Sequence, residues 1–476
     1  MKKEVKSIPP KGDDLSEWYT QVCLKAQLVD YAPVRGCIVL RPYGFAIWEL
    51  IKEAFDKRFK ATGHQNAYFP LLIPESLIAR EADHIEGFAP EVAWVTEGGG
   101  EKLTERLAIR PTSEGIIGMM YARWIQSHRD LPVLINQWCN VMRWEKATRP
   151  FLRTLEFLWQ EGHTAHVSQE EAKLEVLRML GVYREVAEDV LALSVISGRK
   201  SENERFAGAL STFAIEALMP DGKALQAGTS HELGQNFAKA YDIRFTDVDE
   251  QVKHVWTTSW GVSWRILGGL IMAHGDDRGL VLPPAVAPYQ AVIVPIPKKD
   301  DTGVLDAART LHAELGGDVR VHLDDRLEQS APWKFNEWEM RGVPVRVEIG
   351  PRDLANGQVT LARRDTFEKV SVARAEAGPR MRAMLGEIQA ALGKRTREYR
   401  ECHTTSATTR EEFVAALKRQ DGFVLAPWCG RNECEMDIKA ETNAVSRVIT
   451  EEAPAGERCA FCDRPATVKA YFARSY

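Results

Sequence analysis

The stretch LPVLINQWCNVMRWEKATRPFLRTLEFLWQEGHTA, residues 131–165, decides the fold. It contains two apolar runs, 131–145 and 153–165, that are dense in residues favouring β-structure, and the charged loop KATRPFL separates them. Two such runs joined by a short loop predict a pair of long antiparallel strands. An antiparallel sheet is therefore expected to form around this pair.

Ionisable residues recur along both predicted strands. Trp159, Glu161 and His163 are two positions apart and therefore share one face of their strand. Arg143 and Glu145 are expected to do the same on the neighbouring strand. Buried charge is costly unless it is paired or used on a ligand, so a structural ion-pair network is one interpretation. Alignment on one face favours the other interpretation, a polar floor that suits a small zwitterion beside a polyphosphate.

The segments around this pair predict an α+β domain. Apolar residues at helical spacing after Pro42 indicate a helix that ends at Gly63. Ser168 and Glu171 form a capping box at the start of a second helix. Long antiparallel strands with helices on one side are typical of an α+β domain, which we assign to residues 1–285.

The pattern changes after a proline-rich linker at residues 283–288. Strands are expected at 289–297, 319–325 and 343–350. Helical stretches separate them, which predicts a small α/β domain with a mixed sheet over residues 286–375. A helix over 379–401 then leads into a C-terminal domain, residues 376–476.

The composition excludes several classes of protein. Among 476 residues, 45% are hydrophobic and 27% charged, which excludes intrinsic disorder and collagen-like repeats. The formal net charge of -5 excludes a general polycation, so a nucleic-acid site has to be a local basic patch. No run approaches the ~18 apolar residues of a membrane helix, and the charged start lacks the apolar segment of a secretory signal. We therefore expect no membrane contact and a cytoplasmic location.

Four of the eight cysteines crowd the C-terminus in two close pairs. The pairs are Cys429 with Cys434 and Cys459 with Cys462. Two tight turns that each present two thiolates suit a tetrahedral zinc ion, and four protein ligands make such a site structural rather than catalytic. The alternative is four unconnected buried thiols. We predict zinc, or a degenerate fold of the zinc type.

Several motifs in order along the chain resemble one family. Arg143-x-Glu145, its loop and the return strand with Phe157 resemble motif 2 of the class II aminoacyl-tRNA synthetases. The segment GVSWR at 261–265 is similar to their motif 3, and the helix and strand that end at Pro74 to motif 1. The stretches RPTSE, FLWQEGHT, QAGTSH and HGDDRGLVLPP are more discriminating. Together they resemble the prolyl-tRNA synthetases of the type shared by archaea, eukaryotes and some bacteria, over essentially the whole chain.

The resemblance implies a fold and a reaction. The fold is an antiparallel-sheet class II catalytic domain, an α/β anticodon-binding domain and a small C-terminal α/β domain of the zinc-binding type. The reaction is activation of L-proline with ATP to prolyl-adenylate and pyrophosphate, followed by transfer of proline to the 3′ end of tRNA(Pro). The resemblance further implies a homodimer, and magnesium used with ATP, whose ligands the sequence does not assign.

The resemblance also implies the residues of the site. Those expected to bind proline are Thr112, Glu114, Arg143, Trp159, Glu161, His163, Phe206 and His231. Those expected to bind ATP are Arg143, Glu145, Arg153, Thr154, Gln226, Thr229, Ser263 and Arg265. These residue types match the groups of proline, since its ammonium needs a carboxylate, its carboxylate needs a cation and its pyrrolidine ring needs apolar walls. The two catalytic residues would be Arg143, bridging the proline carboxylate and the α-phosphate, and Arg265, stacked on adenine.

Three finer expectations follow from the same resemblance. Glu339 and Arg346 match the region that reads anticodon bases, although a solvated helix face or strand end would look alike. The terminal carboxylate of Tyr476 is expected near the active site. His163 and Gly261 lie too close in sequence for the large editing domain of the bacterial type. No cis-editing is therefore expected. Some activation of alanine or cysteine is expected, because a missing methylene changes the binding free energy by only about 1–3 kcal/mol.

Two other interpretations compete. A synthetase fold can be reused in a non-catalytic binding protein, but the expected ATP contacts Arg143, Glu145, Gln226 and Arg265 are all present. A class II synthetase for threonine or glycine is the other alternative, and RPTSE and WQEGH argue against it.

Overall fold

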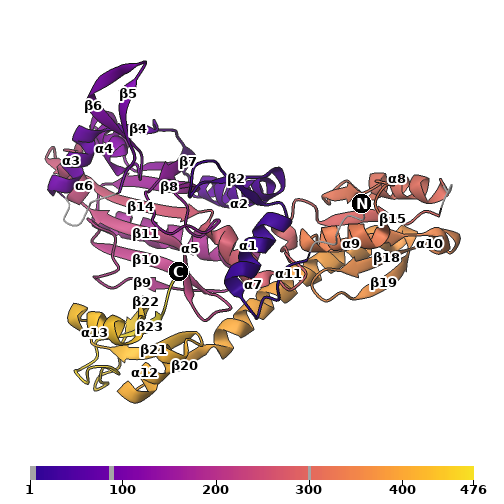
Figure 1. Cartoon of the computed structure of the whole chain (residues 1–476). Coiled ribbons are helices and arrows are strands. Elements are labelled where there is room, and N and C mark those ends of the chain that lie inside the picture. The colour runs from indigo at the N-terminus through magenta and orange to yellow at the C-terminus, as the bar shows by residue number, and fades with distance from the viewer. Residues whose placement is uncertain (1–6, 85–90, 299–301) are drawn as a thin grey trace.

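The computed structural model describes residues 7–84, 91–298 and 302–476. Within this part of the chain, eleven strands form one continuous sheet in the order β20-β21-β23-β22-β9-β10-β11-β14-β8-β7-β3 (Figure 1). Near one edge β7 (Val133–Met142) and β8 (Glu156–His166) run antiparallel, with Val133 opposite Ala165. The predicted strand pair is confirmed, although β7 ends three residues earlier than expected.

The neighbouring strands continue the antiparallel pattern. They are β9 (Val195–Arg199), β10 (Ser211–Leu218), β11 (Ala224–Gly234) and β14 (Trp256–Ser263), and β3 (Gln65–Asn66) adds a short parallel strand at the edge. Long antiparallel strands of this kind confirm the predicted α+β architecture.

Helices cover one face of this sheet. They are α1 (Leu15–Lys25), α2 (Pro42–Ala61), α5 (Gln169–Glu185) and α7 (Arg265–His274). Helix α5 begins at the predicted position, where the Ser168 hydroxyl accepts the N–H of Glu171 at 3.2 Å. Among the described residues the return bond to the Glu171 carboxylate is not formed, so only half of the predicted capping box is present. Phe55, Tyr183 and Trp260 are among the side chains buried between the helices and the sheet. Full burial of such a side chain contributes roughly 1.5–3 kcal/mol, so each of these aromatic residues stabilises the contact between the helices and the sheet.

A glycine in β8 separates the core face from the polar face. Gly162 lies between Glu161 and His163, and a Cβ atom there would come within 2.1 Å of the Trp260 ring. Only glycine leaves room for the indole. The core therefore packs tightly under this strand, while its two ionisable neighbours point to the opposite face.

Smaller elements complete the N-terminal domain. The strands are β1 (Val29–Tyr31), β2 (Ile38–Leu40), β4 (Leu72–Pro74), β5 (Trp94–Gly98), β6 (Glu101–Ile109), β12 (Arg244–Thr246) and β13 (Val252–His254), and the helices are α3 (Glu75–His84), α4 (Glu114–Trp124) and α6 (Asn236–Ala240). Across the described residues, every helix is too short or too polar to cross a membrane.

The second domain has its own mixed sheet, in the order β16-β15-β17-β18-β19. Its strands are β15 (Ala291–Pro295), β16 (Val321–Leu323), β17 (Val345–Ile349), β18 (Gln358–Arg363) and β19 (Lys369–Ala373). Its helices are α8 (Gly303–Leu315), α9 (Ala331–Met340) and α10 (Pro351–Ala355). The first three strands are parallel and the last two pairings antiparallel, so the predicted α/β mixed sheet is confirmed.

A long helix leads from this domain to the C-terminal one. Helix α11 (Ala377–Cys402) matches the helix predicted over 379–401 to within two residues at its start and one at its end. It is followed by the strands β20 (Thr404–Ser406), β21 (Phe423–Trp428), β22 (Val445–Glu452) and β23 (Val468–Ala473), and by the helices α12 (Arg410–Arg419) and α13 (Asn432–Thr442). In Figure 1 this yellow domain lies against the central sheet, while the orange second domain lies at the other end of α11.

The C-terminal strands extend the central sheet, which the sequence did not predict. Strand β22 pairs with β9 where Ile449 lies opposite Arg199. A Cβ atom on Gly198 would come within 2.3 Å of the Ile449 carbonyl oxygen, so this contact requires glycine. The first and the last domains therefore share one hydrogen-bonded sheet.

Candidate active site

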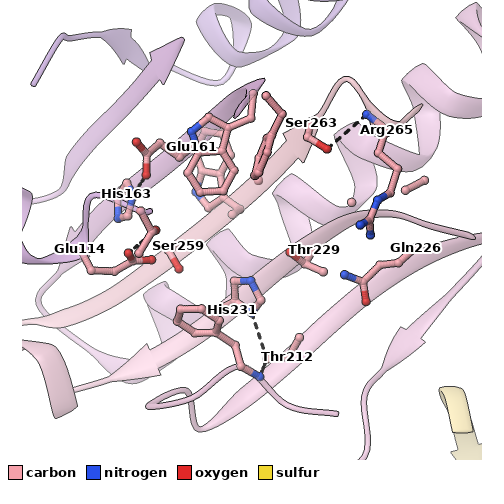
Figure 2. Close-up of a pocket in the computed structure, with 18 of the residues that line it drawn as sticks. Glu114, Glu161, His163, Thr212, Gln226, Thr229, His231, Ser259, Ser263 and Arg265 are labelled. Carbon is pink, nitrogen blue, oxygen red and sulfur yellow. Dashed lines mark hydrogen bonds and ion pairs between the residues drawn. The ribbon is translucent and has the colours of Figure 1, made fainter. Parts of the chain in front are cut away.

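A pocket of about 260 Å³ opens on the sheet face that is turned away from the helices. It is lined by residues of β8, β11 and β14, by the starts of α4 and α7, and by the segment before β10. Twelve of the predicted site residues line it, namely Thr112, Glu114, Arg143, Trp159, Glu161, His163, Phe206, Gln226, Thr229, His231, Ser263 and Arg265. Figure 2 shows Glu114, Glu161 and His163 at one end and Gln226, Thr229, Ser263 and Arg265 at the other.

A β-bulge explains how β11 contributes three of these residues. The register between β10 and β11 shifts after Ile215, so that Gly228 and Gln226 lie opposite consecutive residues. Without the shift, alternation would send Gln226 to one face and Thr229 and His231 to the other. The extra residue lets all three line the same pocket, since a bulge re-aims the side chains that follow it.

The acidic end of the pocket is built around Glu161. Its carboxylate accepts hydrogen bonds from the Ser113 hydroxyl at 2.5 Å and from the Gln137 amide at 2.7 Å, and lies 3.2 Å from His163 Nε2. Burial raises the pKa of Glu161, but the bonds from His163, Ser113 and Gln137 outweigh burial and keep the pKa below its usual value. Glu161 is thus an ionised group whose oxygens are already engaged by the protein.

The contact between Glu161 and His163 shifts the pKa of His163 in the opposite direction, upwards. Burial lowers the pKa of His163, but its bond to Glu161 and the charges of Glu114 and Glu161 outweigh burial and raise the pKa above its usual value. Glu114 stands at the first position of α4, is buried, and accepts a hydrogen bond from the Thr112 hydroxyl. This end of the pocket therefore offers a second carboxylate, Glu114, to a ligand.

His231 forms an apolar wall together with Phe206. The two rings lie 4.7 Å apart between centroids, and His231 Nδ1 is 3.0 Å from the Thr212 hydroxyl. Burial lowers the pKa of His231 to about 3, so its ring is neutral at pH 7. Thr212 was not predicted as a site residue, and nothing in its sequence surroundings distinguishes it.

Buried histidines make the stability of the fold sensitive to acid. Burial lowers the pKa of His166 to about 4 and those of His231 and His274 to about 3, all below the usual 6.5. Because each pKa is lower in the folded chain, the unfolded chain binds more protons, and stability present above about pH 6.5 is lost as the pH falls towards 3. We expect the urea midpoint to fall over that window. His274→Gln, which keeps a donor for the Leu191 carbonyl at 2.8 Å, should make the fall shallower, and an unchanged slope would contradict this account.

Two arginines mark the other part of the pocket. Arg143 Nε donates to the Pro111 carbonyl at 3.1 Å, and its guanidinium lies 5.5 and 5.4 Å from the ring centroids of Phe157 and Trp159. Arg265 Nε donates to the Leu152 carbonyl at 2.9 Å. Within the described residues no hydrogen bond engages the terminal nitrogens of either guanidinium. Both guanidinium groups are therefore held in place through Nε, and their two terminal nitrogens remain as hydrogen-bond donors for an anion.

Three predicted residues lie outside the pocket lining. Glu145, Arg153 and Thr154 belong to the loop between β7 and β8, where Arg153 and Glu145 approach to 3.8 Å. The expectation that Arg143 and Glu145 share a strand face was wrong, because β7 ends at Met142 and alternation stops there. Sequence reasoning also missed Glu204 and Ser259, which do line the pocket. Ser259, Gly261 and Ser263 alternate along β14, so the period-two argument applied to β8 would have found the serine.

The C-terminus approaches the site from the side. The N–H of Tyr476 donates to the Ala224 carbonyl at 3.2 Å, and Ser475 pairs with Ala224 as an isolated bridge. Ala224 starts the strand that carries Gln226 two residues later. The chain end thus runs beside the start of β11, although Tyr476 does not line the pocket.

Glu339 and Arg346 lie together in the second domain. Arg346 Nη1 and Glu339 Oε1 are 2.8 Å apart, and Arg346 also binds Glu348 at 3.0 Å. The guanidinium lies 4.0 Å from the Phe335 ring centroid. Their side chains are only 11% and 14% exposed, so the two residues form a partly buried ion pair and not a solvated surface.

The four clustered cysteines form a group that fits a metal ion. Their sulfur atoms all lie within 4.8 Å of one another, with Cys434 and Cys459 at 3.8 Å and Cys429 and Cys462 at 3.6 Å. Zinc–sulfur bonds of about 2.3 Å in a tetrahedron require sulfurs about 3.8 Å apart. In the described part of the chain this is the only such group of cysteine, histidine and acidic ligands. The donor set and the spacing therefore both suit zinc.

Comparison with known proteins agrees with this architecture over the whole chain. A family model for the tRNA synthetase class II core domain (G, H, P, S and T) matches residues 94–274, one for the anticodon binding domain matches 290–384, and one for the prolyl-tRNA synthetase C-terminal domain matches 410–476.

Curated relatives cover nearly full length. Proline–tRNA ligase of Natranaerobius thermophilus is 56% identical over 475 residues, which is 99% of this chain and 98% of that protein. Those of Symbiobacterium thermophilum and Rubrobacter xylanophilus are each 55% identical, over 489 and 478 residues, and cover 100% of both chains. This confirms the resemblance noted in the sequence and the three-part fold: the chain belongs to the prolyl-tRNA synthetase family of class II aminoacyl-tRNA synthetases.

Proposed function

We propose that this chain is a proline–tRNA ligase that activates L-proline with ATP and transfers it to the 3′ end of tRNA(Pro). The observation that carries the proposal is the division of one pocket into two chemical ends. One end offers carboxylates and aromatic walls, which suit a cyclic ammonium. The other offers Arg265 with amide and hydroxyl groups, which suit a nucleotide.

At the amino-acid end we assign the ammonium of proline to Glu114. Glu161 has its oxygens engaged by Ser113, Gln137 and His163. Its proposed role is therefore to hold His163 in place, and also Ser113, which lies between the proposed proline contacts Thr112 and Glu114 in sequence. Trp159 and Phe206 form the apolar walls for the pyrrolidine ring. A neutral His231 adds to the wall without repelling the ammonium.

At the nucleotide end we assign the α-phosphate to Arg143 and the adenine to Arg265. Gln226, Thr229 and Ser263 surround the nucleotide, and Glu145, Arg153 and Thr154 would reach it from the loop between β7 and β8. Magnesium would accompany ATP and neutralise its phosphates, with no protein ligand assigned. The same Arg143 fork would hold the proline carboxylate against the α-phosphate.

The proposed chemistry requires positioning rather than an enzyme nucleophile. A carboxylate oxygen of proline attacks the α-phosphorus, and the bond to pyrophosphate breaks. A ribose hydroxyl at the tRNA 3′ end then attacks the prolyl carbonyl, and AMP leaves with the bonding electrons. Arg143 meets the negative charge that develops at the α-phosphate in the first step.

The test is exchange of pyrophosphate into ATP, measured with each of the twenty amino acids. We expect strong exchange with proline and weaker exchange with alanine or cysteine, because a missing methylene costs only about 10- to 200-fold in discrimination. Every residue between His163 and Gly261 is described, and these residues build strands and helices of the core and not a separate editing domain. Absence of exchange with proline would refute the function, and exchange with proline alone would refute the prediction about alanine and cysteine.

We further propose that the second domain reads the anticodon, with Glu339 and Arg346 at the contact. Single-stranded anticodon bases expose the edges that a protein can read. The proposed domain limits are 1–285, 286–375 and 376–476, supported by the 3₁₀ turn Pro284–Val286 and by the start of α11 near those limits. We assign Cys429, Cys434, Cys459 and Cys462 to one structural zinc ion.

A homodimer and a cytoplasmic location complete the proposal. Large apolar side chains are exposed on β1 and β2, between them and at the start of α2, namely Tyr31, Val34, Val39 and Phe45. Such a group is typical of an interface, and a sedimentation mass of one chain would contradict the dimer. All eight cysteines are free, which suits a reducing compartment.

A further inference from the structure

One wall of the pocket comes from an irregular segment between two strands. Residues 200–210, here called the wall segment, connect β9 to β10 and contribute Glu204 and Phe206 to the pocket lining. Phe206 is attached to the sheet through its N–H, which donates to the Thr212 hydroxyl at 3.0 Å. Its ring packs against the His231 ring, with 4.7 Å between the centroids and an angle of 35° between the planes. The segment has no regular hydrogen-bond ladder of its own, so its shape depends on what it contacts.

The C-terminal domain contacts the wall segment at two points. Asn203 Nδ2 donates to Glu435 Oε2 at 3.1 Å and to the Asn432 carbonyl at 3.3 Å, both at the start of α13. On the other side, Arg447 of β22 lies 3.8 Å from Glu204. Asn203 and Glu204, which precede Phe206 in the wall segment, are therefore held by a helix and a strand more than 200 positions away in sequence.

Both contacts are anchored in buried, charged structure. The second oxygen of Glu435 accepts the N–H of Ser446 at 3.0 Å, and the side chain is 2% exposed. Arg447 is 4% exposed and binds Glu216 at 2.7 Å, and Lys200 binds the same carboxylate at 3.1 Å. Buried charges that are paired hold their geometry, because breaking the pair leaves an uncompensated ion. Fixed partners of this kind set the position of the segment they touch.

We propose that the C-terminal domain positions the amino-acid wall of the pocket, with Glu435 and Arg447 acting through Asn203 and Glu204. The inference rests on the proposed function, since it takes proline as the ligand of this wall. Phe206 touches the amino-acid end and not the nucleotide end, so a displaced wall segment weakens proline binding and leaves ATP binding intact. The same displacement weakens the binding of alanine less than that of proline, because alanine has no ring to contact Phe206.

The test reverses the polarity of one hydrogen bond. Asn203→Asp places a carboxylate against Glu435 and removes the donor, and Asn203 is exposed, so the variant is expected to fold. We expect KM for proline to rise about tenfold, KM for ATP to stay within about twofold, and the preference for proline over alanine to fall. The double variant N203D/E435Q restores a bond in the opposite direction and should recover most of the proline KM. Glu435→Gln keeps the oxygen that Ser446 needs.

A matched control and three outcomes decide the inference. Glu433→Gln removes a charge from the same turn of α13 at a side chain that is 78% exposed, and it should change neither KM. The inference is overturned if N203D leaves proline KM unchanged, if proline and ATP KM rise together, or if E435Q fails to rescue N203D. Proline-dependent exchange by the unaltered chain tests the proposed function separately, so failure of one does not imply failure of the other.

Discussion

Arg143→Gln is expected to lower kcat/KM for proline-dependent pyrophosphate exchange by about 100- to 1000-fold. The guanidinium is fixed by the Pro111 carbonyl and by the rings of Phe157 and Trp159, and its terminal nitrogens face the pocket. A glutamine keeps one donor but neither the charge nor the fork, so it cannot bridge a carboxylate and a phosphate. Most of the loss should appear in kcat, because the charge to be stabilised develops in the transition state.

The control for this variant is Lys146→Gln. It removes the same charge from the same loop, at an exposed side chain outside the pocket lining, and should leave exchange within about twofold of the unaltered chain. Arg143→Lys adds a second comparison, since it restores the charge without the planar fork. An Arg143→Gln chain that folds and exchanges at the normal rate would remove Arg143 from the mechanism.

Cys459→Ser is expected to release zinc and to destabilise the C-terminal domain by several kcal/mol. A structural zinc supplies roughly 10–16 kcal/mol to small zinc folds at neutral pH, and a serine hydroxyl is a poor substitute for a thiolate. Cys459 is buried and its sulfur lies 3.8 Å from that of Cys434, so the substitution removes one of the four thiolates at the centre of the cysteine group. Zinc content per chain and the thermal midpoint are the two measurements.

Cys402→Ser is the matched control, because this cysteine is exposed and lies outside the cluster. It should leave both zinc content and the midpoint unchanged. A purified chain that contains no zinc, and whose midpoint does not move in Cys459→Ser, would favour the interpretation of four unconnected thiols.

Local patterns in the sequence predicted most of the elements. The start of helix α5 and the helix expected over 379–401 were predicted from capping residues and from the spacing of apolar residues, which are signals that act within a few turns. The strand pair 131–165 depends on composition and on a short loop. Such signals fail at element ends, and β7 therefore stopped before Glu145 and left that residue in a loop.

Features that depend on distant contacts were not predictable in the same way. The pairing of β22 with β9 joins residues near 449 and 199, and the only local trace of it is Gly198. The bulge in β11 changes which residues face the pocket, and alternation alone would have separated Gln226 from Thr229. Glu204 lies in a segment without periodicity, so no pattern marked it. The twelve predicted residues that line the pocket were found through the family resemblance more than through spacing.

The shared sheet has a consequence for how this chain is made. Strand β9 emerges from the ribosome long before its partner β22, and at about 5–20 residues per second the delay is roughly 10–50 s. During that time the outer edge of β9 has unpaired backbone groups, which can template pairing with another chain. Gly198, which allows the final contact, also weakens this edge as a strand. The nascent chain is therefore exposed to aggregation at this edge until β22 has been made, and β22 then caps β9 within the same chain.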